Sequence, residues 1–313
     1  MDKSSFFIEN KALFGSYPTQ ESVNELEKEG VRFFINLTYS KEKKIQPYFT
    51  KYNYINYPIN DQGVPSNLVH FSCFIIKLSD IINKLTNNEL LFIHCKGGHG
   101  RAGIVVACLL CYMFNLLPSE SIKLTTKYHS ERKIMREKWR NIGSPQTSKQ
   151  KYFVQQMCEQ LHFYKVKNNG YTAGFSNFSL FPVNYKNYVF PTSEAAIQAT
   201  KDITNKEYVK KQTESTTPII SKKLSKTIKV TQDWVENCEE YMIEILYNKF
   251  SNNHKIKKML ISTGLRPIIQ TTRGDNFWGD GGDGSGKNIL GKSLVKVREI
   301  FYRELIENNY YII

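Results

Sequence analysis

The stretch "LLFIHCKGGHGRAG", residues 90–103, constrains the fold more than any other part of the chain. Apolar residues run directly into His94 and Cys95, three glycines follow within a few positions, and a second apolar run begins after Arg101. A short apolar run that is closed by a glycine turn and followed by a longer apolar segment is typical of a buried strand leading into a helix. The stretch therefore predicts a strand–turn–helix unit.

The surrounding sequence repeats this alternation. Strands are predicted over residues 31–40 and 52–59, and a helix over 21–30 that ends at Gly30. Further helices are predicted over 71–85 and 102–117, the second ended by Pro118, and over most of 119–165 apart from "NIGSPQTS". The first part is expected to be an α/β domain, with a central sheet that carries helices on both faces.

The polar, glycine-containing segment "KVKNNGYTAG", residues 165–174, is the expected boundary. We expect one domain over residues 1–166 and a mostly helical α+β domain over 170–313. A chain of 313 residues is long enough for two such cores.

The net charge of +14 is shared between the two parts, with +8 up to residue 165 and +6 beyond it. This balance favours acidic ligands such as phosphates, nucleic acids or anionic lipid head groups. The alternative is an ordinary solvated surface in a chain rich in Lys, Asn, Ile and Tyr. The oligomeric state stays open.

Six cysteines show no regular spacing, which favours reduced thiols and a cytoplasmic protein, with the nucleus as the alternative. Cys108 and Cys111 match C-x-x-C but lie inside an apolar run, so buried thiols are favoured over a metal site. That run of 15 residues is too short to span a membrane. The N-terminus lacks a secretory pattern. No metal and no cofactor are expected.

The glycine turn suits nucleophilic attack on phosphorus. A thiolate at the end of a strand and before a helix N-terminus is stabilised by backbone N–H groups and by the helix dipole. Glycines let the backbone close around a tetrahedral anion, and Arg101 offers a fork of donors that matches phosphate oxygens. The predicted phosphate-binding residues are Lys96, Gly97, Gly98, His99, Gly100 and Arg101. The alternative is a tight turn that contains an incidental cysteine.

This His-Cys-x5-Arg pattern resembles the signature of the dual-specificity and tyrosine phosphatases. The resemblance implies Cys95 as nucleophile, Arg101 as phosphate ligand and Asp61, 34 residues upstream, as general acid. His94 is expected to hold the loop rather than act as a base, and Gln150 to help place water. Ala102 departs from the usual Ser or Thr, which implies slow release of the phospho-cysteine intermediate.

The second half contains "FPTSEAAIQATK", "MLISTGLRPIIQ" and "GDNFWGDGGDGSGKNILGKSLVKVRE" in order. These segments resemble the NADAR (YbiA-like) family. The resemblance implies an N-glycosidase that acts on small ribosides, such as riboflavin-pathway intermediates, or on ADP-ribosylated bases of nucleic acids. Such a reaction builds positive charge on the ribose, which a carboxylate can stabilise.

The resemblance implies Glu194 and Asp275 as the catalytic acids. The implied riboside- or ADP-ribose-binding residues are Phe175, Ser176, Asn177, Lys201, Trp278 and Gly279. The alternatives are a surface acid at 194, a core aromatic at 278 and a solvated lysine at 201. Ala195 and Gln270 stand where family members often carry His and Glu.

The sequence thus predicts a bifunctional hydrolase. The alternative is a binding protein that recognises phosphate and ADP-ribose marks without turnover. Substrates of the first domain could be a phosphoprotein, an RNA 5′ end or a phosphoinositide. The basic run "ERKIMREKWR", residues 131–140, is interpreted as a solvated helix face, with contact to a phosphorylated or nucleic-acid partner as the alternative.

Overall fold

The computed structural model describes residues 2–164, 172 and 174–308. The chain divides into two compact units. The first holds the residues up to Glu159, together with Gly264–Arg266 and the described residues from Leu305 onward, and the second holds Gln160–Thr263 and Pro267–Glu304. The expected boundary segment, residues 165–174, falls almost entirely outside the described residues.

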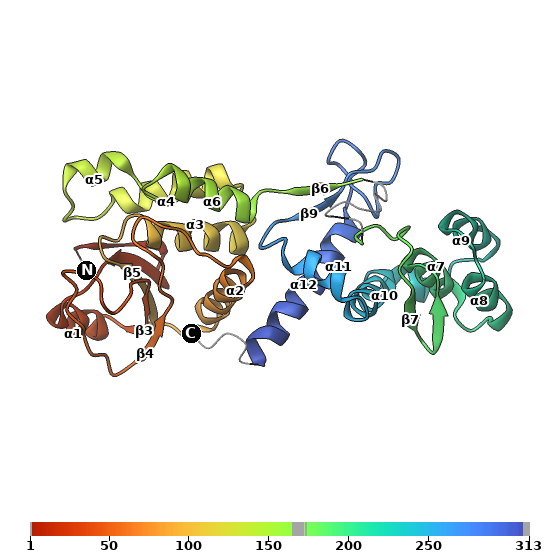
Figure 1. Ribbon diagram of the computed structural model, residues 1–313, viewed down its shortest axis with the longest axis horizontal. Coiled ribbons are helices and arrows are strands. Elements are labelled where there is room, and N and C mark those ends of the chain that lie inside the picture. The colour runs from red at the N-terminus through yellow and green to blue at the C-terminus, as the bar shows by residue number, and fades with distance from the viewer. Residues whose placement is uncertain (1, 165–171, 173, 309–313) are drawn as a thin grey trace. The chain divides into compact units, whose positions relative to one another are not determined.

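The first unit is built on a five-stranded sheet with the strand order β1-β2-β5-β3-β4 (Figure 1). Its strands are β1 (Ser4–Ile8), β2 (Ala12–Ser16), β3 (Val31–Asn36), β4 (Asn53–Asn56) and β5 (Leu90–Cys95). β1 pairs with β2 in the antiparallel sense, whereas β2, β5, β3 and β4 are parallel. β1 and β2 were not predicted from the sequence.

Helices cover both faces of this sheet, as expected from the sequence. They are α1 (Gln20–Lys28), α2 (Leu68–Lys84), α3 (Arg101–Phe114), α4 (Pro118–Ser130), α5 (Glu137–Ile142) and α6 (Ser148–Cys158). Val23 and Leu26 of α1 pack with Phe34 and Phe92 on one face. α3 packs against β2 and β5 and lies beside α4 and α6 (Figure 1). Pro118, expected to end a helix, stands at the first turn of α4, where its missing N–H costs nothing.

All six residues of β5 are buried, which matches a central parallel strand covered on both faces. α3 is also buried along most of its length. The strand–turn–helix unit predicted from residues 90–103 therefore forms the centre of the first unit.

The second unit is mainly helical. Its helices are α7 (Ser193–Ala199), α8 (Lys206–Thr213), α9 (Pro218–Leu224), α10 (Gln232–Ser251), α11 (His254–Ile261) and α12 (Ile289–Glu307). β6 (Leu161–Phe163) and β9 (Ile268–Gln270) form a parallel pair, and β7 (Val183–Tyr185) and β8 (Tyr188–Phe190) an antiparallel one. One apolar cluster, with residues such as Phe190, Leu246 and Phe301, forms its core.

No helix among the described residues is both long enough and apolar enough to cross a membrane. The described residues contain no group of three His, Cys, Asp or Glu side chains arranged to hold a metal ion. All six cysteines are buried, and none of them forms a disulfide.

Candidate active sites

The parallel strands bring the candidate catalytic residues of the first unit to one edge of the sheet. In the strand register Ser16 lies opposite Cys95, and Asn36 lies opposite His94. The glycine turn leaves β5 at this edge, and the loops that follow β3 and β4 leave it there too. The carboxyl ends of parallel strands are where ligands bind in such sheets.

The glycine turn is held by its carbonyl groups. Gly98 O accepts a hydrogen bond from Arg132 Nη2 at 2.9 Å, and His99 O accepts one from Ser144 Oγ at 2.5 Å. In a planar trans peptide the N–H points opposite to the C=O. The N–H groups of His99 and Gly100 therefore point away from these outer partners, toward the inside of the loop.

Gly98 must be glycine. Its φ is +73°, a conformation that other residues rarely adopt, and a Cβ there would lie 2.5 Å from Gly15 O. The loop therefore packs directly on the backbone of β2, with no room for a side chain between them.

Arg101 is the most densely bonded side chain of the site and is only 2% exposed. Its Nη1 donates to Glu42 Oε1 and to Ile59 O at 3.0 Å, and its Nη2 donates to Glu42 Oε2 and to Asp61 Oδ1, both at 3.1 Å. Burial lowers the pKa of Arg101, but the hydrogen bond to Glu42 and the charges of Cys95 and Asp61 outweigh burial and raise that pKa. The guanidinium is therefore a permanent, preoriented cation.

Glu42 was not predicted from the sequence. It lies in an irregular loop between β3 and β4, with no periodicity and no motif around it. Glu42 contacts Arg101 only because the tertiary fold brings the two residues together. No local sequence signal could therefore have identified Glu42.

A cavity of about 250 Å³ brings together the predicted residues of the first site, except Gly98, which does not line it. It is lined by Asp61, Gln62, Cys95, Lys96, Gly97, His99, Gly100, Arg101, Trp139, Gln146 and Gln150. Gln150 is fully buried; its Nε2 donates to Gly63 O at 3.1 Å, and its amide fills the space where a side chain at Gly100 would lie. Gln150 therefore links the loop that carries Asp61 to the glycine turn.

His94 does not line this cavity, and aromatic side chains surround its ring. It is fully buried, contacts Tyr17 and Phe92, and its Nε2 lies 2.6 Å from Tyr48 Oη. Burial lowers the pKa of His94 to about 3, so the ring is neutral. His94 O accepts the N–H of Leu37 at 2.9 Å. These contacts suit a residue that supports the loop.

One wall of the cavity is aromatic. The ring of His99 stacks on Trp139 at 4.9 Å between centroids, and its Nδ1 lies 2.7 Å from His129 Nε2. Burial and the charge of Arg132 lower the pKa of His99 to about 4. His99 therefore contributes a flat, neutral surface to the rim, with Trp139 as a neighbour that the sequence did not predict.

The second unit holds a cavity of about 220 Å³. It is lined by Tyr164, Ser176, Asn177, Phe178, Glu194, Ile197, Gln198, Lys222, Gln270, Thr272, Asp275, Trp278 and Leu290. Five of the expected site residues are among them, from segments nearly 100 positions apart in the sequence.

Three expected residues lie elsewhere. Phe175 is fully buried in the apolar core, with its ring 5.9 Å from that of Phe163. Lys201 Nζ donates to Ser225 Oγ at 3.3 Å and does not line the cavity. Gly279 is buried, with the backbone of Gln270 beside it, and does not line it either.

Glu194 is a carboxylic acid in a buried position, in the first turn of α7. It is 7% exposed and accepts a hydrogen bond from Gln198 Nε2 at 2.9 Å. Burial, aided by the negative charge of Asp275, raises the pKa of Glu194, although Lys222 and the Gln198 bond act against this shift. Asp275 Oδ1 accepts the N–H of Trp278 at 2.9 Å, which fixes the acid at the cavity wall.

Three carboxamide oxygens of this cavity lack donors. Asn177 Oδ1, Gln198 Oε1 and Gln270 Oε1 are each buried without a hydrogen-bond partner. Buried acceptors without donors are costly, and natural proteins rarely keep several in one place. Together with Lys222, the cavity offers hydrogen-bond acceptors, two acids and one cation to a ligand.

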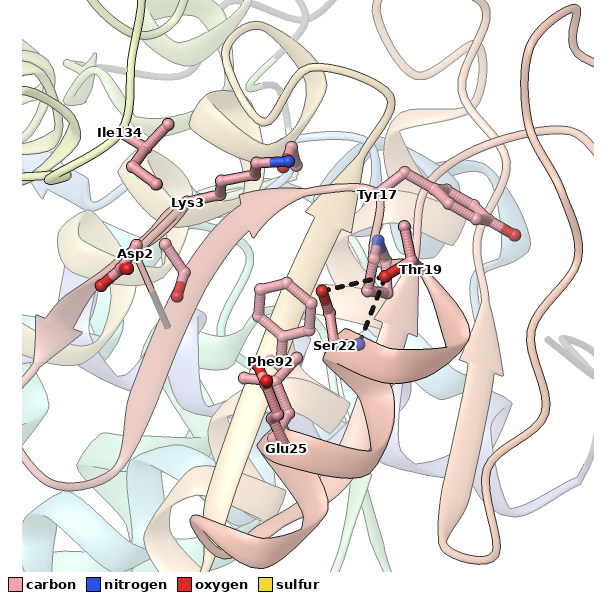
Figure 2. A pocket seen from close by; sticks show the side chains of 12 residues that line it. Asp2, Lys3, Tyr17, Thr19, Ser22, Glu25, Phe92 and Ile134 are labelled. Atoms are coloured by element: carbon pink, nitrogen blue, oxygen red, sulfur yellow. Dashed lines mark hydrogen bonds between the residues drawn. The ribbon is translucent and has the colours of Figure 1, made fainter.

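A further cavity of about 210 Å³ lies where β1, β2 and α1 meet (Figure 2). Thr19 caps α1 there: its Oγ1 accepts the N–H of Ser22 at 3.3 Å. Phe92 and Leu26 supply its apolar side. None of its described lining residues is a cysteine or a histidine, so it offers no nucleophile comparable with Cys95.

Two family models match the chain. A model described as "Swiss Army Knife protein, DSP-PTPase phosphatase domain" matches residues 5–154, and a model described as "NADAR domain" matches residues 162–302.

Among curated proteins, "Putative tyrosine phosphatase 197R" of Invertebrate iridescent virus 6 is 33% identical over 304 residues, which cover 95% of this chain and 91% of that protein. "Putative tyrosine phosphatase 067L" of Invertebrate iridescent virus 3 is 40% identical over 50% of this chain and 65% of its own length. "N-glycosidase YbiA" of Escherichia coli strain K12 is 29% identical over 44% of this chain and 86% of its own length.

Proposed function

Because this chain belongs to the family in which a DSP-PTPase phosphatase domain precedes a NADAR domain, we propose that it is a bifunctional hydrolase. The first activity is a metal-free, cysteine-dependent phosphatase. One observation carries it: Cys95, Arg101 and Asp61 line one cavity, and Arg101 Nη2 lies 3.1 Å from Asp61 Oδ1.

The reaction follows in two steps. The Cys95 thiolate attacks phosphorus, the bond from phosphorus to the leaving oxygen breaks, and Asp61 gives that oxygen its proton. Asp61 then takes a proton from water, which attacks the phospho-cysteine and releases phosphate and the thiolate. Arg101 and the inward N–H groups stabilise the charge that develops on the phosphoryl oxygens. The water is expected to be oriented with the help of Gln150, which lines the same cavity.

Steady-state hydrolysis of p-nitrophenyl phosphate tests this activity. We expect turnover by the natural chain, none by Cys95→Ser, and in Asp61→Asn a loss of about 100-fold, within the range for general acid–base catalysis. Lys133→Met changes an exposed lysine that does not line the cavity and is the matched control. Hydrolysis that persists in Cys95→Ser would refute the proposal.

The second proposed activity is an N-glycosidase acting on a riboside or on an ADP-ribosylated base. Glu194 and Asp275 face one cavity, and burial favours the protonated form of Glu194, which suits an acid or base for breaking a C–N bond. The oxygens of Asn177, Gln198 and Gln270 that lack hydrogen-bond partners could accept hydrogen bonds from a leaving base that carries several N–H donors. Guanine and amino-pyrimidinones present such an edge.

Release of ADP-ribose from DNA that is ADP-ribosylated on guanine tests the second site. We expect release by the natural chain and by Lys223→Ala, an exposed neighbour of Lys222 that does not line the cavity, and none by Glu194→Gln. A small riboside from the riboflavin pathway serves as the second substrate. Equal release by Glu194→Gln and the natural chain would refute the assignment.

Binding without turnover is the second candidate, and Ala102 favours it for the first site, since it provides no hydroxyl to help the thiolate leave. A natural chain that binds phosphate and ADP-ribose but hydrolyses neither probe would support that function. A phosphoprotein, an RNA 5′ end or a phosphoinositide is the proposed substrate class. The six cysteines, none of which forms a disulfide, support a cytoplasmic location.

A further inference from the structure

Lys249 is a buried cation that bonds to the wall of the second cavity but takes no part in the proposed reaction. It lies on α10, its side chain is fully buried, and it does not line the cavity itself. Its Nζ donates to Ser176 O at 2.9 Å, to Ser179 Oγ at 2.9 Å and to Ser193 Oγ at 3.2 Å. An ammonium group has three N–H donors, so these three acceptors, from two separate segments, use all of them.

The bonds of Lys249 hold the peptide groups on both sides of Asn177. Ser176 O belongs to the peptide group before Asn177 and accepts Lys249 Nζ directly. Asn177 O belongs to the peptide group after it and accepts Ser193 Oγ at 3.4 Å, the same hydroxyl that accepts Lys249 Nζ. Asn177 O also accepts the N–H of Glu194 at 3.0 Å. Lys249 therefore connects Asn177 to the start of α7, which carries Glu194.

Asn177 and Glu194 are the members of this connection that carry polar groups for a ligand. Both line the cavity, and Asn177 Oδ1 is buried without a hydrogen-bond partner. Asn177 Nδ2 lies 3.6 Å from Met242 Sδ, and a thioether is a weak acceptor. Side-chain bonds therefore fix this carboxamide only loosely, and its direction depends on the backbone that Lys249 holds.

A buried ammonium group is a costly way to hold a loop, because nothing nearby balances its charge. No ion pair among the described residues includes Lys249. The rings of Phe181 and Phe250 lie 6.0 Å and 5.7 Å from its Nζ, at the outer limit of a cation–π contact. Burial lowers the pKa of Lys249 to about 7. Costly buried charges of this kind concentrate at functional sites, where position matters more than stability.

We propose that Lys249 is a positioning residue of the second cavity, which clamps Asn177 against the start of α7 and so sets the directions of the Asn177 carboxamide and the Glu194 carboxyl group. This role deepens the proposed N-glycosidase function and rests on it. Because Lys249 does not line the cavity, it acts through Asn177 and Glu194 and not by touching the substrate.

Hydrogen–deuterium exchange of the full chain at pH 6 reads this clamp without any substrate. The amides of Ser179 and Glu194 donate to the carbonyl groups of Ser176 and Asn177. Two reporter peptides, which span the described residues 174–182 and 191–199, therefore follow both ends of the clamp.

Lys249→Met should raise the exchange rate of both reporter peptides about tenfold, the effect of losing roughly one hydrogen bond. Peptides from α12 should exchange no faster, because removal of an unpaired buried charge does not weaken the rest of the unit. Faster exchange confined to the clamp is a result that a general structural role would not give. Lys255→Met changes an exposed lysine on α11 and should leave every peptide unchanged.

Ser193→Ala tests the same clamp if Lys249→Met does not fold by circular dichroism. It removes the hydroxyl between Lys249 and Asn177 O but keeps the cation. Thr192, which caps α7, is unchanged, so the helix still begins at the same residue. We expect severalfold faster exchange in both reporter peptides.

Release of ADP-ribose from DNA that is ADP-ribosylated on guanine connects the clamp to the reaction. Lys249→Met should lose about 10- to 100-fold in kcat/KM, since misplacement of a group by roughly 1 Å can cost about 100-fold. Unchanged kcat/KM in a variant whose reporter peptides exchange faster would overturn the proposal.

The proposal is also overturned if the reporter peptides of Lys249→Met exchange at the natural rate, or if peptides from α12 are accelerated equally. The same holds for Ser193→Ala where it replaces Lys249→Met. Because exchange needs no substrate, the two proposals fail separately. A natural chain that releases no ADP-ribose refutes the glycosidase, and the exchange rates still decide whether Lys249 holds Asn177 in place.

Discussion

The buried charge of Lys249 should lower the free energy of unfolding of the second unit. The substitution Lys249→Met should therefore raise that free energy. Lys249, on α10, is fully buried and donates only to neutral oxygens: Ser176 O and Ser179 Oγ at 2.9 Å and Ser193 Oγ at 3.2 Å. No ion pair among the described residues includes it.

The magnitude follows from linkage. Burial lowers the pKa of Lys249 from 10.5 to about 7. The unfolded chain therefore binds a proton up to pH 10.5 that the folded chain releases above pH 7, so stability rises with pH across this window and the penalty is fully present below it. At 1.36 kcal/mol per pH unit, the penalty is about 5 kcal/mol at pH 6 and about 2 kcal/mol at pH 9.

Methionine has a similar length and no charge. The oxygens that Lys249 leaves keep other partners, since Ser179 Oγ donates to Ser176 O at 2.6 Å and Ser193 Oγ to Asn177 O at 3.4 Å. Lys249→Met should therefore raise the free energy of unfolding by a few kcal/mol at pH 6, and by less at pH 9.

Urea unfolding of the full chain at both pH values measures this. Trp234 and Trp278 belong to the second unit, so both proteins carry Trp139→Phe to remove the signal of the first unit. Lys255→Met, an exposed lysine on α11, is the control and should change little. A gain that is the same at pH 6 and pH 9, or a loss at pH 6, would refute the linkage argument.

Three further outcomes are expected in the first unit. Glu42→Gln, which weakens the anchor of Arg101, should lower kcat/KM for p-nitrophenyl phosphate about 30-fold, equivalent to roughly 2 kcal/mol, whereas unchanged kcat/KM would show that the anchor is dispensable. Gly98→Ala should destabilise the unit by more than the approximately 1–3 kcal/mol that backbone strain alone costs, because the added Cβ also meets the backbone of Gly15. Gly274 has a positive φ but open space around it, so Gly274→Ala measures strain alone, and thermal unfolding compares the two variants. Ala102→Ser should raise steady-state turnover and reduce the trapped phospho-enzyme seen by rapid quench; the same turnover with no trapped intermediate would contradict slow release.

The strand, turn and helix around Cys95 were predictable because local patterns encode them. Apolar residues before Cys95, glycines after it and an apolar run from Ala102 each indicate one element without any tertiary information. Asp61 was implied by the resemblance to the phosphatases, and it lines the same cavity as Cys95. The fold class followed from the same alternation of strands and helices.

Residues that act through long-range packing escaped prediction. Glu42 and Lys222 lie on segments whose sequence shows no motif, and Trp139 reaches the cavity from a helix of six residues. Arg132 was hidden in a run of charges, where one inward arginine cannot be told from its outward neighbours. Strands β1 and β2, of five residues each, were missed although β4, with four, was predicted.

Because Gly98 packs directly on the backbone of Gly15, the glycine turn depends on a strand that lies outside the His-Cys-x5-Arg sequence. A Cβ at Gly98 would strike the backbone at Gly15, and a Cβ at Gly15 would lie 2.9 Å from Lys3 O and from Ser4 Cβ. A glycine turn transplanted alone into another scaffold would therefore lack the strand backbone on which Gly98 packs. For engineering, the structural unit is therefore the glycine turn together with β2, whose Gly15 precedes Gly98 by 83 residues.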